Sequence, residues 1–224
     1  MKKTEFDYLS DHYDKTLKDS FPKALEEVNY FSTYKVKLVY ELVRNKKNIH
    51  ILDFGCGQGT SLKIFSDYFK SSKLWGYDVS KEFIKKKKKK KMNIKLTTDL
   101  KKIPKKKFDL IFISGVLHHI NIKNHNKILS HCRDFLNKTG EIYVFEHNPI
   151  NPFTNYIFKN AVIDRKAEMV SSKKLVGSAL KARLKVISLK YTLFFPKQLS
   201  FLRFLEKFLV WLPLGAQYLL ILKK

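Results

Sequence analysis

The chain has 224 residues and a formal net charge of +25. With 44% hydrophobic and 14% aromatic residues, its composition supports a buried core and excludes a largely disordered chain, and its length suits a single compact domain. Only two cysteines occur, Cys56 and Cys132, which excludes a disulfide framework or a cysteine-rich zinc site. We therefore expect a cytoplasmic protein without a bound metal.

No segment of the sequence predicts insertion into a membrane. The first residues turn acidic where a signal peptide requires an apolar stretch. The longest apolar run, residues 208–222, is interrupted by Pro213, Gly215 and Gln217 and is shorter than the ~20 residues of a membrane span. We expect no transmembrane segment.

The positive charge comes almost entirely from lysine. Of the 45 basic residues 5 are arginine, and the lysines are spread along the chain apart from the run 85–91. Proteins that read phosphates or base edges favour the planar fork of arginine. We expect no specific nucleic-acid partner, although nonspecific association with polyanions or anionic membranes follows from such a charge.

Hydrophobic periodicity changes along the chain. Residues 1–47 show helical spacing and predict a helical cover, and the remainder, 48–224, forms the main domain. Short apolar runs at 49–54, 74–78, 94–98, 108–114 and 141–146 alternate with helical stretches. This alternation predicts parallel strands covered by helices on both faces. In the last third, a helix capped at Ser171 or Ser172 and reaching residue 184 precedes two extended runs, 186–195 and 217–222.

The most informative motif follows the first apolar run. Asp53 ends that run, and Gly55, Gly57 and Gly59 follow at alternate positions before a helix begins. Glycine permits positive φ and lets a ligand approach the backbone closely. Taken alone, the motif also fits a tight turn without a ligand.

Two further carboxylates extend this motif. Asp78 ends the second run, 19 residues after Gly59, where a carboxylate can accept both hydroxyls of a ribose. Asp99 follows the third run and also fits an ordinary turn. The spacing predicts a site for an adenosine-containing cofactor. Thr60 at the sixth position of the loop disfavours a dinucleotide, whose fingerprint requires glycine or alanine there.

In combination with residues 108–120 and 136–142, these motifs resemble class I S-adenosylmethionine-dependent methyltransferases, in particular type 11/12-like, uncharacterised bacterial small-molecule methyltransferases. The resemblance implies an α/β fold with a Rossmann-like, seven-stranded, mostly parallel sheet, helices on both faces and an N-terminal helical cover. The segment 6–14 resembles the part of that cover which lies over the cofactor. The resemblance implies S-adenosyl-L-methionine as the cofactor, and the residues expected to bind it are Asp53, Gly55, Gly57, Gly59, Asp78, Val79, Asp99, Leu100 and Ser114.

The acceptor is expected to be a small molecule, with O-methylation favoured. A hydroxyl nucleophile benefits from a general base, and His119 and His147 follow strands predicted to end at the active edge. We rank them as catalytic candidates above His118, and each also fits a capping or core histidine. Asn148 and Asn151 would rim the acceptor pocket, or form a structural turn.

Two other classes of protein compete with this interpretation. The charge of +25 suggests an RNA or other nucleic-acid methyltransferase or binding protein, but residues 114–117 lack a base-methylating motif. A nicotinamide-dependent oxidoreductase is less favoured because of Thr60.

Overall fold

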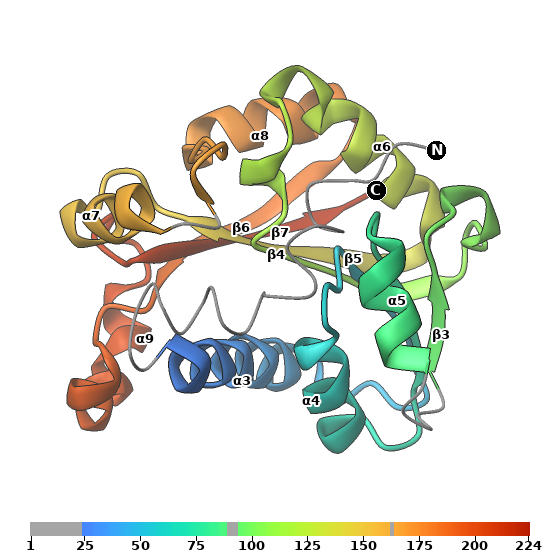
Figure 1. Cartoon of the computed structure of the whole chain (residues 1–224), viewed down its shortest axis with the longest axis horizontal. Coiled ribbons are helices and arrows are strands. Elements are labelled where there is room, and N and C mark those ends of the chain that lie inside the picture. Colours follow the sequence, from blue (N-terminus) through green and yellow to red (C-terminus); the bar gives the residue numbers. More distant parts are fainter. Residues whose placement is uncertain (1–23, 89–93, 162–163) are drawn as a thin grey trace.

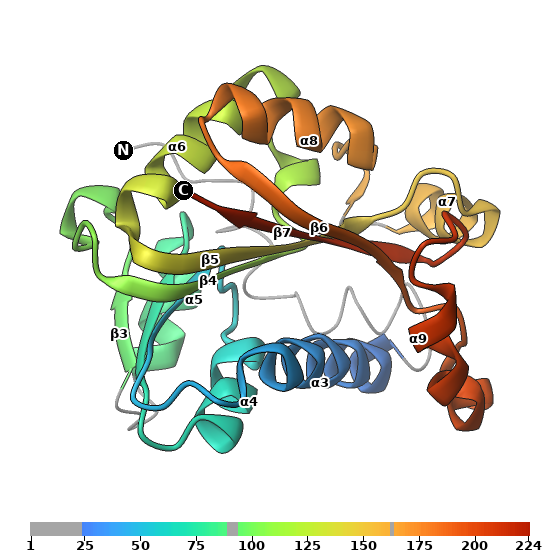
Figure 2. The same cartoon turned by 180° about the vertical axis from the view of Figure 1, so that it is seen from behind.

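The computed structural model describes residues 24–88, 94–161 and 164–224, which form a twisted central sheet with helices on both sides (Figures 1 and 2). The strands are β1 (His50–Phe54), β2 (Lys73–Tyr77), β3 (Ile94–Thr97), β4 (Phe108–Ser114), β5 (Leu136–His147), β6 (Lys185–Thr192) and β7 (Gln217–Lys223). The α-helices are α3 (Ala24–Val43), α4 (Thr60–Tyr68), α5 (Lys81–Lys88), α6 (His125–Phe135), α7 (Pro152–Asn160), α8 (Ser172–Lys181) and α9 (Glu206–Leu209). Short 3-10 helices are η1 (Leu100–Lys102), η2 (Leu117–His119), η3 (Ile122–Asn124) and η5 (Lys197–Leu205). Within these described ranges, no helix combines the length and apolarity needed to cross a bilayer.

The sheet has seven strands in the order β3-β2-β1-β4-β5-β7-β6. The first five strands are mutually parallel, and β7 runs antiparallel between β5 and β6. This confirms the predicted α/β architecture with a reversed edge. Because the strand order reverses between β1 and β4, their carboxyl ends border the crevice in which such sheets bind ligands.

Each face of the sheet is covered by its own set of helices (Figure 1). Helices α3 and α4 pack on one face through Val36, Val39 and Phe65, and α5 joins them through Ile84. On the opposite face α6 and α8 bury Leu129 and Leu175, among others. The central strands β1 and β4 are buried from both sides, which explains their nearly continuous apolar sequences.

Several boundaries differ from the predicted ones. Strand β5 begins at Leu136 rather than at residue 141, because Leu136 already pairs with Phe108 ahead of a register shift. Gly140 passes so close to β4 that a Cβ there would lie 2.5 Å from the Phe108 carbonyl oxygen. Helix α8 is capped by Ser171 and ends at Lys181, short of residue 184, because the chain turns at Arg183 with φ 58°.

Part of the predicted cover and of the lysine run lies outside the described residues. Helix α3 falls within the predicted cover 1–47, whereas the segment 6–14 is not described. The run 85–91 begins on α5, as expected, and its residues 89–91 are likewise outside the described ranges.

Candidate active site

The glycine loop after β1 is held in an unusual backbone conformation. Gly55, Gly57 and Gly59 have φ values of 80°, 46° and 71°, which other residues rarely adopt. The amides of Gly55 and Cys56 donate to the Tyr77 carbonyl at 2.7 and 2.9 Å, so the loop is tethered to the end of β2. Among the described residues, no atom lies within 4 Å of a Cβ built at Gly57. This part of the chain therefore leaves the Gly57 backbone accessible, as close approach of a ligand requires.

Asp78 lies directly against this loop. Its carboxylate accepts hydrogen bonds from the Gly57 amide at 2.7 Å and from the Ser80 amide at 2.8 Å. The side chain is buried, and Val79 beside it is half exposed. The sequence therefore predicted correctly that Asp78 and the glycine loop come together.

Four other expected cofactor residues lie at or near the carboxyl ends of the strands. Asp53 is buried in β1, and Ser114 is the last residue of β4. Asp99 follows β3 and caps η1 by accepting the Lys101 amide at 2.9 Å, the geometry of an ordinary turn, with Leu100 beside it packed against the core.

Lys35 brings a cation from α3 to the end of β4. Its ammonium group donates to the Ser114 hydroxyl at 2.9 Å and lies 6.0 Å from the centroid of the Phe145 ring. Burial lowers the pKa of Lys35 to about 8, against the opposing attraction of Glu146. The helix that covers this face thus contributes a charged group to the site.

A cluster of histidines and carboxylates occupies the carboxyl ends of β4 and β5. The buried Glu146 accepts hydrogen bonds from the amides of Val116 and Leu117 through Oε1, at 3.1 and 2.7 Å. Its Oε2 lies 2.6 Å from Nδ1 of His118. Nε2 of His118 and Nε2 of His119 each lie 3.5 Å from Oδ1 of Asp164. Glu146 therefore fixes the position of η2, the segment that carries His118 and His119.

The charges of this cluster follow from its contacts. Burial opposes ionisation of His118, but the charge of Glu146 and the hydrogen bond with Asp164 raise its pKa to about 9. Burial also opposes the charge of Glu146, yet His118 lowers the pKa of Glu146 to about 2. At neutral pH both groups are therefore ionised. Because both ring nitrogens of His118 then carry a proton and face Glu146 and Asp164, His118 cannot accept a proton from an acceptor molecule.

His147, the last residue of β5, remains neutral. Burial and the positive charge of His118 lower its pKa to about 4. Its ring lies 5.1 Å from the ring of His118, centroid to centroid, and 5.6 Å from that of Phe158 on α7. The ring of His119 lies 4.2 Å from that of His118, and its side chain keeps 18% of its exposure. Both histidines expected to be catalytic therefore meet in one cluster.

This cluster adjoins the glycine loop. A Cβ at Gly55 would overlap the side chain of Val116, so the loop packs against the segment that leads into η2. Gly115, with φ 67°, turns the chain between the end of β4 and the histidines. The expected cofactor loop and the expected acceptor residues thus share one edge of the sheet.

Two asparagines near this edge have structural roles. Asn148 donates from Nδ2 to the carbonyl oxygens of Pro213 and Gly215 at 3.0 and 2.8 Å. Asn151 accepts the Thr154 amide at 2.8 Å and so caps α7. Of the two interpretations left open by the sequence, the structural turn accounts for both side chains.

Three residues of the site were not predicted from the sequence. Glu146 immediately precedes His147 at the end of an apolar strand, and a carboxylate in that position of the sequence could have been recognised as a site residue. Asp164 and Lys35 come from segments with no local motif, and only the fold brings them to the cluster.

Comparisons with known proteins agree with this arrangement. Residues 52–142, which span the glycine loop, Asp78 and β4, match the family model described as a methyltransferase domain. An uncharacterised protein of Methanocaldococcus jannaschii is 28% identical over 164 residues, covering 70% of this chain and 69% of its own length.

Solved structures share the fold at low sequence identity. An S-adenosylmethionine-dependent methyltransferase of Archaeoglobus fulgidus superimposes with a TM-score of 0.60 at 20% identity, covering 84% of this chain and 94% of its own. A plantazolicin methyltransferase, solved with a monoazolic desmethyl analogue and S-adenosylhomocysteine, has a TM-score of 0.67 at 18% identity, with 98% and 95% covered. Residues 52–142, which carry the glycine loop against Asp78, therefore form a methyltransferase domain, and the chain has the fold of S-adenosylmethionine-dependent methyltransferases.

Proposed function

We propose that this enzyme transfers the methyl group of S-adenosylmethionine to an oxygen atom of a small-molecule acceptor. The observation that carries the proposal is the cluster at the cofactor edge, in which Asp164 lies 3.5 Å from Nε2 of His119 and forms a compact group with His118 and His147. Such a cluster can hold a hydroxyl and take its proton. The small-molecule complex of the plantazolicin methyltransferase supports the choice of acceptor class. Cys56 and Cys132 are buried and form no disulfide, which favours a reducing compartment, and we propose that the reaction takes place in the cytoplasm.

In this proposal the cofactor lies over the glycine loop. Its binding residues are Asp53, Gly55, Gly57, Gly59, Asp78, Val79, Asp99, Leu100 and Ser114. When bound, S-adenosylmethionine supplies a methyl group on a positively charged sulfur, and the neutral thioether is a good leaving group. The protein orients the acceptor in line with that methyl and excludes water.

His119 and His147 have different parts in the proposed mechanism. His119 takes the proton of the acceptor hydroxyl at Nδ1, and Asp164, 3.5 Å from Nε2, fixes the orientation of its ring. His147 stays uncharged and positions the hydroxyl by accepting or donating a hydrogen bond. His118 is a positioning residue, because its two ring nitrogens face Glu146 and Asp164.

The chemistry is tested by a panel of matched acceptors. The purified enzyme is incubated with methyl-labelled S-adenosylmethionine and with phenols, alcohols, amines and thiols that share one carbon skeleton. We expect label on the hydroxyl compounds only. Transfer to the amines or thiols alone would overturn the assignment to oxygen while leaving the methyltransferase activity intact.

Asp78→Ala is expected to weaken S-adenosylhomocysteine binding by about tenfold to several hundredfold. The substitution removes an acceptor that shapes the loop at Gly57 and, in our proposal, two charge-assisted hydrogen bonds to ribose, each worth ~1.5–3 kcal/mol. Calorimetry measures the affinity.

Asp109→Ala is the matched control for this variant. Asp109 also accepts two hydrogen bonds, from the His50 amide at 2.8 Å and from Asn137 at 2.6 Å, but it lies near the start of β4, away from the cofactor edge. The affinity of the Asp109→Ala protein for S-adenosylhomocysteine should match that of the wild type. Equal affinities of the Asp78→Ala and wild-type proteins would remove Asp78 from the cofactor site.

A further inference from the structure

Large apolar side chains protrude from two neighbouring segments on one side of the molecule. Phe153 and Tyr156 stand on α7, and Phe201, Phe204, Phe208 and Trp211 stand on the connection between β6 and β7. All six are between 62% and 72% exposed. We call this set the aromatic patch. A contiguous patch of this kind on a protein surface marks an interaction site.

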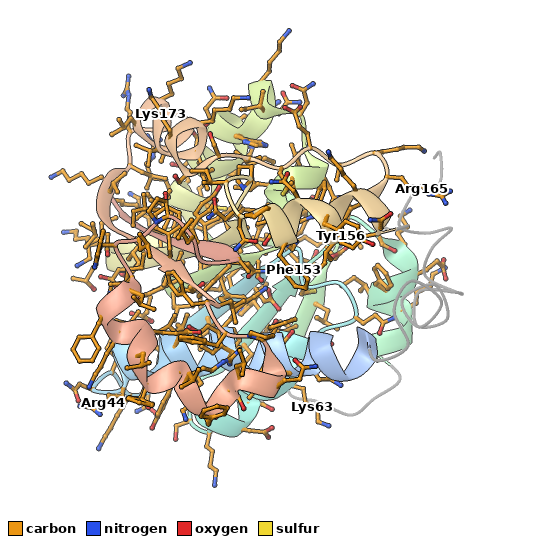
Figure 3. The ribbon with its side chains drawn as sticks, turned by 90° about the vertical axis from the view of Figure 1, so that its left-hand side faces the viewer. Arg44, Lys63, Phe153, Tyr156, Arg165 and Lys173 are labelled. Carbon is orange, nitrogen blue, oxygen red and sulfur yellow. The ribbon has the colours of Figure 1, made fainter. Side chains whose placement is uncertain are left out.

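The two segments of the aromatic patch are joined to each other. Nδ2 of Asn151, at the start of α7, donates to the Leu214 carbonyl at 2.6 Å, and the Thr154 hydroxyl donates to the Ala216 carbonyl at 3.0 Å. Figure 3 shows Phe153 and Tyr156 facing the viewer from α7, on the side where the η5–α9 segment also lies. The aromatic side chains therefore belong to one surface.

The aromatic side chains are presented by a firmly attached segment. Glu206, buried in α9, accepts the amides of Phe194 and Phe195 at 3.0 and 3.4 Å, and the Tyr34 hydroxyl of α3 at 2.5 Å. Arg203 stacks over Tyr34 at 4.5 Å from the ring centroid. Phe201, Phe204, Phe208 and Trp211 follow at three- to four-residue spacing, so they project from the outer side of a helical segment whose inner side is anchored.

The charge around the aromatic patch is positive. Exposed cations flank it at Lys159 and Lys207, and the Lys207 ammonium lies 4.8 Å from the centroid of the Phe208 ring. Glu206 is the one acidic residue among 150–161 and 196–216, and it is buried. Exposed aromatic rings beside cations, with no exposed carboxylate among them, complement an anionic lipid surface.

We propose that the aromatic patch docks the enzyme on the surface of an anionic lipid bilayer, with its rings at the level of the headgroups and its flanking cations against lipid phosphates. Phe158, on the same helix as Phe153 and Tyr156, packs on the rings of His118 and His147 at 5.6 Å. Docking through α7 therefore brings the acceptor cluster next to the bilayer. The proposal is independent of which atom is methylated.

Vesicle co-sedimentation of the full chain tests the proposal. We expect binding to vesicles of equal parts phosphatidylglycerol and phosphatidylcholine, weaker binding to phosphatidylcholine alone, and weakening by salt. The double substitution Phe204→Ser with Trp211→Ser should lower the partition coefficient at least about tenfold. S-adenosylhomocysteine affinity should not change, which separates loss of docking from loss of the cofactor site or of folding.

The matched control exchanges two apolar residues of similar exposure outside the aromatic patch. Leu180 on α8 and Ile187 on β6 are 59% and 51% exposed, and their double exchange to serine should leave vesicle binding unchanged. Trp211→Phe should retain binding but lose the blue shift of tryptophan fluorescence that the wild type shows with vesicles.

Three results would overturn the proposal. The first is equal vesicle binding by the wild type and the Phe204→Ser, Trp211→Ser protein. The second is a dimer, measured by light scattering, that this double substitution disperses, because the aromatic patch would then bind a second copy of the chain. The third is RNA binding that depends on the same two aromatic residues in the absence of vesicle binding.

Discussion

His119→Ala should lower the turnover number by about 10²- to 10⁴-fold with a hydroxyl acceptor, the usual contribution of a general base. A general base acts only in its deprotonated form, so the wild-type rate should rise with pH and the variant should lose that rising limb. Rates measured at saturating cofactor over a range of pH check the prediction. S-adenosylhomocysteine affinity should remain close to that of the wild type, because the imidazole acts on the acceptor.

The control for this variant is His131→Ala. His131 lies in the second half of α6, and none of the contacts found in the cluster involves it. Its removal should leave both the rate and the pH profile unchanged. A normal rate for His119→Ala would show that positioning alone drives the reaction, and loss of the limb in His147→Ala instead would transfer the role of base to His147.

Glu146→Ala should destabilise the fold by about 3–5 kcal/mol. The substitution leaves the amides of Val116 and Leu117 without their acceptor and a charged His118 without its nearest counter-ion, all in a buried setting. Urea unfolding at pH 7 measures the loss. Glu41→Ala on α3 is the control: Glu41 pairs with Arg44 at 3.4 Å on the surface, and its loss should cost far less.

The pair of His118 and Glu146 also makes the stability of the fold depend on pH, at both high and low pH. The pKa of His118 is raised to about 9, so its contribution is complete below its ordinary pKa of 6.5 and is lost as the pH rises through 9. The pKa of Glu146 is lowered to about 2, so its contribution is present above 4.5 and is lost as the pH falls towards 2. Glu146→Gln, which keeps the shape of the side chain, should flatten the fall in stability between pH 6.5 and 9. An unchanged slope would assign that dependence to other groups.

The fold could be predicted because its signals are local. Alternating apolar runs and helical stretches predicted the five parallel strands, and the alternate glycines predicted a loop that the structure places against Asp78. The boundary of β5 could not be predicted, because residues 136–140 pair with β4 only through a register shift that no periodicity reveals.

The acceptor side of the site depends on tertiary contacts. His119 and His147 could be proposed because each follows a strand, but the sequence does not reveal that Glu146 and Asp164 enclose His118 between them. Asp164 and Lys35 lie in segments whose local patterns predict only solvent-facing charge. Their pairing with Nε2 of His119 and with Ser114 is a consequence of how α3 and the segment after α7 pack on the sheet.

The contact between Lys35 and Ser114 makes the covering helix a thermodynamic partner of whatever binds at the end of β4. A ligand that replaces the Lys35 ammonium as the donor to the Ser114 hydroxyl removes one of the attachments of α3 to the sheet. Reciprocity requires that any change which loosens α3 alters the affinity of that ligand by the same factor. An anion that accepts hydrogen bonds from both the Lys35 ammonium and the Ser114 hydroxyl has the opposite effect on α3, because its binding holds the helix to the strand.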